Sequence, residues 1–235
     1  MSLEENIRKV RKNIALAARE VGRDPGEITL CAATKTQSDE TIRAAIAAGI
    51  TLCGENRVQE MTAHLDADAY VGSEVHFIGH LQTNKVKQVV GRVEMIESVD
   101  SLRLLEAIDR QAASLAIRQD ILLEVNIGRE PSKSGVLPQE VEALARAALG
   151  LSNVRLRGLM AIPPLSAPGE SRGFFRETRQ LFVDIKRKMA HNENDINCLS
   201  MGMSGDYMDA VREGATLIRV GTALFGARAP VFPRG

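Results

Sequence analysis

The sequence predicts an α/β protein built as a single (β/α)8 barrel, and three observations support that prediction. Eight short runs rich in β-forming residues alternate with stretches of helical periodicity over roughly 200 residues, which matches a TIM barrel in count and length. The first strand is followed by Thr34–Gln37 without a glycine, whereas an open doubly wound sheet usually has a glycine-rich turn there. Because the alternation uses almost the whole chain, we expect one barrel over residues 1–229 and a flexible tail at 230–235.

Each predicted strand is a short run of β-forming or apolar residues bounded by polar residues or glycine. The first one, Ile28–Thr34, ends beside a single cation, Lys35. The others, in chain order, are Thr51–Cys53, Val75–Ile78, Met95–Val99, Ile121–Ile127, Val154–Ile162, Asn197–Met201 and Thr216–Val220. A helical or turn segment follows each strand, so βα units repeat along the chain.

The segments between the strands carry helix signals. The first helix has apolar residues at helical spacing and stops at Gly22. Ser38 is a suitable N-cap with two acidic residues after it, and Pro138 fits the first turn of a later helix. The predicted helices are Leu3–Val21, Asp39–Ala48, one from near Arg57, one ending near Val90, one from the Asp100–Ser101 cap to Leu115, Pro138–Leu149, Ser171–Met189 and Asp206–Glu213, with a short turn near Phe225.

Composition and charge exclude several classes of function. Lys and Arg total 30, Asp and Glu total 30, and aromatic residues make up 3%, so we expect no nucleic-acid surface. The first helix is charged throughout and no apolar run reaches membrane-spanning length, so we expect neither a signal peptide nor membrane association. Three scattered cysteines indicate reduced thiols in a core and hence a cytoplasmic protein. Four histidines without paired spacing argue against a metal site.

Polar residues just past the strands are the candidates for function, because the active face of such a barrel lies at the carboxyl ends of its strands. They are Lys35, Asn56, His80, Gln82, Asn84, Asp100, the Glu130–Gly135 loop, Ser200, Ser204, Arg219 and Thr222. Small residues after the last two strands leave backbone N–H groups open to an anion, and these loops are the usual phosphate site of the fold.

A phosphate at those loops and an amine across the barrel suit pyridoxal 5′-phosphate. Its aldehyde condenses with a lysine, here Lys35, and its phosphate anchors it. Arg219 is expected between the two, near the pyridine nitrogen. Since arginine is always charged, that nitrogen should stay unprotonated, and the ring is then a weak electron sink. The pattern therefore predicts little or no carbanion chemistry.

The motifs taken together resemble the YggS/PROSC family of pyridoxal phosphate-binding homeostasis proteins from about Glu4 to Gly226. They are ATKT, GENRVQE, HFIGHLQTNK, SVDS, EPSKSG, GLMAI, SMGMSGD and RVGTALFG, in this order. The resemblance implies a barrel of the alanine-racemase type (fold type III) with a Schiff base between the cofactor and Lys35. It also implies a role in buffering or delivering the cofactor, without established turnover and without an assigned catalytic residue.

The same resemblance assigns positions around the cofactor. Ser204, Gly221 and Thr222 should hold the phosphate, with Ser200 and Met201 nearby. Arg219 should face the ring nitrogen and Asn56 should flank the ring. PLP-dependent apo-enzymes are then the expected recipients, and the absence of the racemases' second domain favours a monomer.

Other interpretations remain open from the sequence. Lys35 also fits a solvated strand end, and Arg219 fits a structural ion pair with a strand carboxylate such as Glu124. The Gly128–Gly135 loop fits either a solvated loop or a lid, and His80, at a position where many relatives carry proline, is assigned no role. A PLP-dependent amino-acid racemase or lyase with Lys35 as a base is the alternative function. A barrel for another phosphorylated metabolite is the third.

Overall fold

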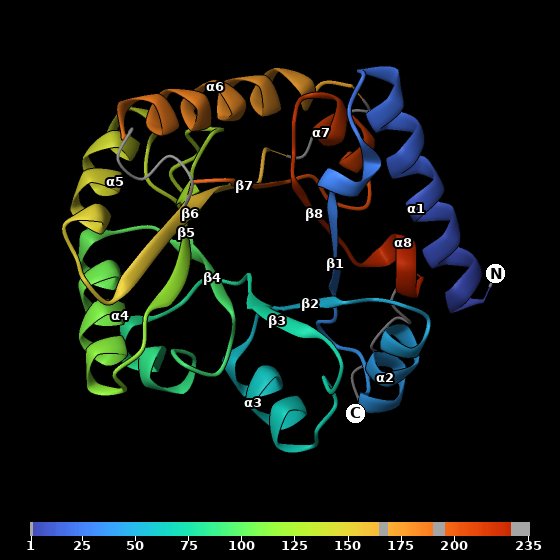
Figure 1. Ribbon diagram of the computed structural model, residues 1–235, viewed down its shortest axis with the longest axis horizontal. Helices are drawn as coiled ribbons and strands as arrows, with labels where there is room; N and C mark the ends of the chain where they lie inside the picture. Colours follow the sequence, from blue (N-terminus) through green and yellow to red (C-terminus); the bar gives the residue numbers. More distant parts are fainter. Residues whose placement is uncertain (1, 165–168, 190–195, 227–235) are drawn as a thin grey trace.

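Eight parallel strands close into a barrel in a computed structural model that describes residues 2–164, 169–189 and 196–226 (Figure 1). Each strand pairs with the next along the chain, and the last pairs back with the first. The strands are β1 (Thr29–Ala33), β2 (Leu52–Glu55), β3 (Glu74–Phe77), β4 (Met95–Val99), β5 (Gln119–Val125), β6 (Val154–Ala161), β7 (Cys198–Met201) and β8 (Leu217–Val220). The predicted barrel is confirmed, and the tail predicted at 230–235 lies outside the described residues.

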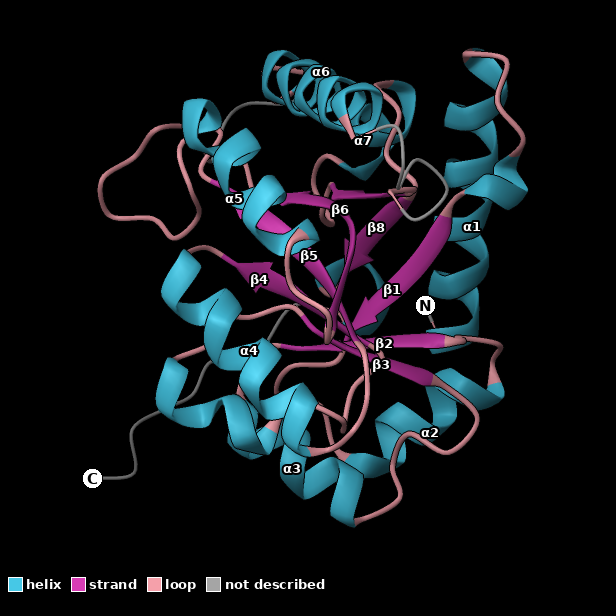
Figure 2. Ribbon diagram, turned by 60° about the vertical axis from the view of Figure 1, so that its left-hand side comes forward, coloured by secondary structure: helices cyan, strands magenta, loops and turns pink. Residues whose placement is uncertain are grey.

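Helices surround the barrel on its outside, as the turned view also shows (Figure 2). They are α1 (Leu3–Glu20), α2 (Asp39–Ala47), α3 (Val58–Asp66), α4 (Leu102–Ser114), α5 (Val141–Leu149), α6 (Arg172–Lys188), α7 (Tyr207–Arg212) and α8 (Thr222–Phe225), with 3-10 turns η1 (Pro25–Glu27), η2 (Thr83–Gln88) and η3 (Pro138–Glu140). Two predictions need correction. The segment ending near Val90 is the 3-10 turn η2, and the helix predicted from Pro138 is α-helical only from Val141. In the described residues, no helix combines the length and apolar character needed to cross a membrane.

Local capping explains where several helices begin. The hydroxyl of Ser38 accepts the backbone N–H of Thr41, as the N-cap signal predicts, and Ser101 does the same for Leu104. Ser2 and Glu5 form a reciprocal capping box at the start of α1. α1 packs beside α7 and α8, so the first and last helices together cover the outside of the barrel where β1 pairs with β8 (Figure 1).

Side-chain alternation along the strands separates two cores. Residues such as Ile96, Leu123 and Leu159 face outward and are buried beneath the helices. Inward-facing residues nearer the amino ends of the strands are mainly apolar. They form a layer across the barrel interior, which we call the floor: Cys31, Leu52, Met95, Leu122 and Leu217. Toward the carboxyl ends of the strands, the inward residues include Glu97, Ser200 and Arg219. The floor therefore separates this polar end of the barrel from an opening at the amino ends of the strands.

Gly158 gives a direct test of barrel packing. Its φ is 148°, and a Cβ added there would lie 1.8 Å from the carbonyl oxygen of Cys198 in the neighbouring strand. Gly158→Ala should lower the free energy of unfolding by about 3 kcal/mol or more, because the backbones of β6 and β7 must separate. Gly173→Ala is the matched control, since an added Cβ there meets nothing within 4 Å in α6. It should be neutral or stabilise by up to about 1 kcal/mol. Equal effects of the two variants in urea denaturation would contradict this packing.

Candidate functional site

A tight turn presents Lys35 at the carboxyl end of β1. The backbone N–H of Gln37 donates to the carbonyl of Thr34 at 3.0 Å, which closes the turn around Lys35 and Thr36. Thr36 has a φ of 64°, a conformation that a β-branched residue rarely adopts. The carboxylate of Glu60 accepts its N–H at 3.1 Å. The lysine, half-buried, is thus carried on a strained turn that neighbouring structure holds in place.

A buried carboxyl group supports the turn from beneath. Glu55, at the end of β2, is fully buried, and its Oε1 accepts from Thr34 Oγ1 at 2.5 Å and from the hydroxyl of Tyr70 at 3.0 Å. Burial raises the pKa of Glu55, and these two hydrogen bonds oppose the shift. Glu55 therefore links Thr34, the residue before Lys35, to Tyr70, which follows α3.

Asn56 follows β2 and lies, like Lys35, at the opening formed by the carboxyl ends of the strands, which we call the mouth of the barrel. Its amide oxygen is buried and has no hydrogen-bond partner among the described residues. Gly79, after β3, lies so close that an added Cβ would be 2.1 Å from the Asn56 carbonyl oxygen. A buried polar atom without a partner costs free energy, so this position is suited to a group that a ligand supplies.

The loops after β7 and β8 meet at Ser204. Its hydroxyl oxygen accepts the backbone N–H groups of Gly221 and Ala223, both at 3.2 Å. The hydroxyl proton is then left to donate to another oxygen, next to the exposed start of α8 at Thr222. The carboxylate of Asp206 accepts the N–H of Met203 at 2.6 Å and fixes the β7 loop. We call these residues the anion cradle, after the phosphate that the sequence predicts at these loops: Ser204, Gly221, Thr222 and Ala223.

Arg219 is buried in the barrel below the mouth and belongs to a chain of hydrogen bonds. Its Nη1 donates to Ser200 Oγ at 2.5 Å, and Ser200 donates to Glu97 Oε2 at 2.6 Å. The other carboxylate oxygen of Glu97 lies 2.7 Å from Nδ1 of His76. Nη2 of Arg219 donates to the carbonyl of Ala161 at 3.1 Å. Five strands, β3, β4, β6, β7 and β8, therefore fix the guanidinium in one place.

Glu97 is the counter-charge of Arg219. The two groups approach to 3.8 Å, and both side chains are almost completely buried. Burial acts to raise the pKa of Glu97, but the His76 hydrogen bond and the charges of His76 and Arg219 outweigh it and lower that pKa. The carboxylate is thus ionised and neutralises the arginine. The structural ion pair left open by the sequence does exist, with Glu97 in place of the suggested Glu124.

Glu124 is a second buried carboxyl group near Arg219. Burial and the charge of Asp100 raise its pKa from 4.5 to about 7, against the opposing charge of Arg219. Because the folded-state pKa exceeds the unfolded one, the folded protein binds the extra proton between pH 4.5 and 7. Stability from this group is therefore full below pH 4.5 and falls as the pH rises toward 7.

Glu124→Gln should remove that pH dependence. Relative to the wild type, the free energy of unfolding of the variant should rise by roughly 2–3 kcal/mol between pH 4.5 and 7 and then stay level. Urea denaturation at a series of pH values, without added cofactor, measures the difference. A difference between the two proteins that is flat across this window would contradict the assignment.

His80 and the loop after β5 lie together at the rim. His80 is exposed, and its Nδ1 lies 3.3 Å from the Ser134 hydroxyl and 3.4 Å from a carboxylate oxygen of Asp100. Asn126 anchors the loop by exchanging two hydrogen bonds with the backbone of Glu130, at 2.8 and 3.1 Å. His80 thus connects the loops after β3, β4 and β5.

The structure brings most of the predicted residues into two groups. Ser204 and Gly221 are hydrogen-bonded to each other, and Ser200 is hydrogen-bonded to Arg219. The side chain of Met201 lies on the opposite face of β7 from Ser200, in the outer core, so only its backbone can face the mouth. Among the described residues, no group of three or more His, Cys, Asp or Glu could hold a metal ion.

Glu97 and His76 are the site residues that sequence reasoning did not assign. Glu97 was the detectable one, because it is a single charge within the apolar strand Met-Ile-Glu-Ser-Val. A charge buried in a strand requires a partner. The alternation of side chains along β4 points Glu97 into the barrel, at the level of Ser200 and Arg219. The same alternation places the side chain of His76 on the inward face of β3.

The lysine turn and the anion cradle on a closed parallel barrel define a barrel of the alanine racemase N-terminal type. In agreement, residues 5–229 match the family described as "Alanine racemase, N-terminal domain". A protein named pyridoxal phosphate homeostasis protein from Aquifex aeolicus is 41% identical over 229 residues, which cover 97% of this chain and 99% of that protein. A protein of the same name from Pseudomonas aeruginosa is 39% identical over 228 residues, covering 97% of this chain and 96% of its own.

A solved relative shares the fold across its whole length. PipY from Synechococcus elongatus PCC7942, in the structure with PLP bound, is 33% identical, with a TM-score of 0.83 over 96% of this chain and 100% of that chain. This chain belongs to the family of pyridoxal phosphate homeostasis proteins. The family resemblance in the motifs is therefore confirmed, and the curated relatives' name describes homeostasis and not an enzymatic reaction.

Proposed function

We propose that this chain binds pyridoxal 5′-phosphate through a Schiff base to Lys35 and serves intracellular homeostasis of the cofactor. The observation that carries the proposal is the placement of an amine turn, an anion cradle and a fixed guanidinium at the same end of one barrel. The PLP-bound structure of PipY, a relative of similar length, supports the choice of ligand.

The residues at this mouth fit the cofactor. The Ser204 hydroxyl and the loops around Gly221 and Thr222 would hold the phosphate. A ligand group would satisfy the buried amide oxygen of Asn56, which has no hydrogen-bond partner among the residues that the structure describes. Ser200 already donates to Glu97 and accepts from Arg219, so its part is to orient the arginine. Met201 would contribute backbone alone.

Arg219 favours holding the cofactor over using it in catalysis. When bound, pyridoxal phosphate supplies an electrophilic aldehyde and a ring that withdraws electrons best when its nitrogen is protonated. A guanidinium facing that nitrogen cannot give up a proton, and the ionised Glu97 keeps its charge compensated. The chain's own residues thus bind and orient the ring while leaving it a weak electron sink.

Binding itself is the first test. The full-length protein mixed with pyridoxal phosphate should develop the visible absorbance of a lysine Schiff base and keep it through desalting. A protein that stays colourless but is protected against heat by other sugar or nucleotide phosphates would instead support a barrel for another phosphorylated metabolite. Exchange of the Cα hydrogen of amino acids for deuterium, above the rate with free cofactor, would support the racemase or lyase alternative.

The proposed function also includes a compartment, an oligomeric state and partners. We place the protein in the cytoplasm as a monomer, with PLP-dependent apo-enzymes as recipients of its cofactor. The three cysteines are free thiols, as is usual for proteins of a reducing compartment, and this supports the cytoplasm. Light scattering of the loaded protein tests the monomer, and activation of an apo-enzyme by the loaded protein tests the transfer.

A further inference from the structure

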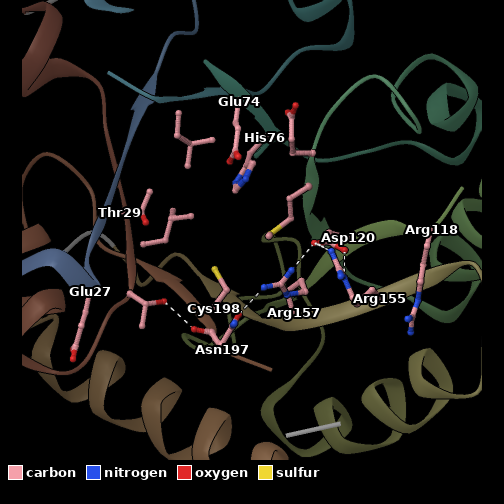
Figure 3. A pocket seen from close by; sticks show the side chains of 15 residues that line it. Glu27, Thr29, Glu74, His76, Arg118, Asp120, Arg155, Arg157, Asn197 and Cys198 are labelled. Atoms are coloured by element: carbon pink, nitrogen blue, oxygen red, sulfur yellow. Dashed lines mark hydrogen bonds and ion pairs between the residues drawn. The ribbon is translucent and has the colours of Figure 1, made fainter. Parts of the chain in front are cut away.

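His76 connects the polar end of the barrel with the cavity at the amino ends of the strands, which has a volume of about 640 Å³ and which we call the amino-end opening. The side chain of His76 points inward from β3 and lines this opening, as does that of Glu74 (Figure 3). Nδ1 of His76 lies 2.7 Å from Oε1 of Glu97, which is fully buried. His76 therefore belongs both to the wall of the opening and to the hydrogen-bond chain that ends at Arg219.

The charge of Glu97 determines how the imidazole of His76 is bonded. An ionised carboxylate only accepts hydrogen bonds, so Nδ1 of His76 donates to Oε1 of Glu97, as the hydroxyl of Ser200 donates to Oε2. Within residues 2–164, 169–189 and 196–226, Nε2 of His76 has no hydrogen-bond partner. The ring thus has one nitrogen committed to Glu97, on a side chain that lines the amino-end opening.

His76 also supports the negative charge that faces Arg219. Burial acts to raise the pKa of Glu97, and the hydrogen bond from His76 is the largest of the effects that lower this pKa, ahead of the charges of His76 and Arg219. The ionised carboxylate lies 3.8 Å from the guanidinium and neutralises it. Loss of the His76 donor therefore changes the charge environment of Arg219 through Glu97.

We propose that His76 is a positioning residue for the cofactor ring, acting through Glu97 on Arg219, and that small solutes can reach its place from the amino-end opening. This inference rests on the proposed function, which places Arg219 at the ring nitrogen. The solute class that fits is a small azole, because it can donate one N–H to Glu97 when the side chain of His76 is absent. The amino-end face of a barrel, which usually serves stability alone, here acts on the opposite end.

The absorbance maximum of the loaded protein tests the positioning role. His76→Leu removes the donor and should shift the maximum in the same direction as Glu97→Gln. His76→Asn keeps an N–H near the place of Nδ1 and should restore most of the wild-type value. In the Glu97→Gln background, His76→Leu should add no further shift, because its route to Arg219 is already lost. Glu74→Gln is the matched control: Glu74 is exposed on β3 and lines the same opening, so the maximum should stay unchanged.

Imidazole tests the access from the amino-end opening. His76→Gly leaves a space beside Glu97, and added imidazole should return the absorbance maximum of this loaded variant toward the wild-type value. Imidazole has no primary amine, so it cannot take the place of Lys35 on the cofactor. In the cofactor-free protein, imidazole near saturation should raise the midpoint of thermal unfolding of His76→Gly by about 2–4 °C. The midpoints of the wild type and of His76→Leu, in which the space is filled, should not change.

These outcomes separate the inference from the proposed function. A wild-type protein that develops no visible absorbance would reject the cofactor function itself. A loaded wild type whose maximum is unchanged by His76→Leu, or shifts that add in the double variant with Glu97→Gln, would overturn the positioning role. Equal effects of imidazole on His76→Gly and on the wild type would overturn the access route. His76→Ala takes the place of His76→Gly if the glycine variant does not fold.

Discussion

Lys35→Ala should abolish the visible absorbance that develops when the protein is mixed with pyridoxal phosphate. A Schiff base requires a primary amine, and the proposal assigns that amine to the strained turn after β1. Residual binding through the anion cradle should persist as weak, colourless association, because Ser204 and its two backbone donors are untouched. Absorption spectroscopy before and after desalting measures the loss.

The matched control for this substitution is Lys12→Ala. Lys12 is exposed on α1, so its removal should leave the absorbance unchanged. Circular dichroism should show the same fold in both variants, since Lys35 is half-buried at a turn and not part of a packed core. A Lys35→Ala protein that keeps the full absorbance would place the covalent link on another lysine and reject the assignment.

Glu97→Gln should lower the free energy of unfolding by about 3 kcal/mol, the cost typical of leaving a buried charge without its partner. The substitution keeps the shape of the side chain and removes the charge opposite Arg219, 3.8 Å away. Glutamine has one acceptor oxygen in place of the two that contact Ser200 and His76, so the loss combines the missing charge with one missing acceptor. Urea denaturation of the cofactor-free protein measures it.

A double-mutant cycle with Arg219→Gln decides whether the two charges act on each other. Removing both should cost less than the sum of the single losses, with a coupling of more than about 1 kcal/mol, because neither charge is then left alone. Purely additive losses would contradict the pairing. In the loaded protein, Glu97→Gln should also shift the absorbance maximum, because the charge of Arg219, which the proposed function places at the cofactor ring, is then no longer neutralised. A merely structural substitution would not shift it.

The sequence predicts the barrel well because its signals are local. Apolar runs of strand length, an N-cap such as Ser38 and the stop at Gly22 each act within a few residues. The corrected elements are those where local signals are ambiguous. The segment Thr83–Gln88 has helical composition but folds as a 3-10 turn, and Pro138 begins a 3-10 turn before α5 continues from Val141.

Only part of the candidate site could be predicted, because the signals in the sequence are local. Position along the chain places Lys35, Ser204 and Arg219 at strand ends, and the topology of a barrel then brings them to one mouth. Contacts across the barrel interior have no local signal. The link from Arg219 through Ser200 to Glu97 joins residues 19 and 103 positions apart, and the closed sheet alone brings them together. The positive φ of Thr36 could not be predicted either, because threonine normally avoids this conformation.

Reduction of the loaded protein with borohydride, followed by mass measurement of its peptides, tests the central claim most directly. Reduction fixes a Schiff base as a stable secondary amine on whichever lysine carries it. The account predicts a single modified peptide, in which the reduced cofactor is attached to Lys35. A modification confined to another lysine, or none at all in a protein that had bound the cofactor, would contradict it.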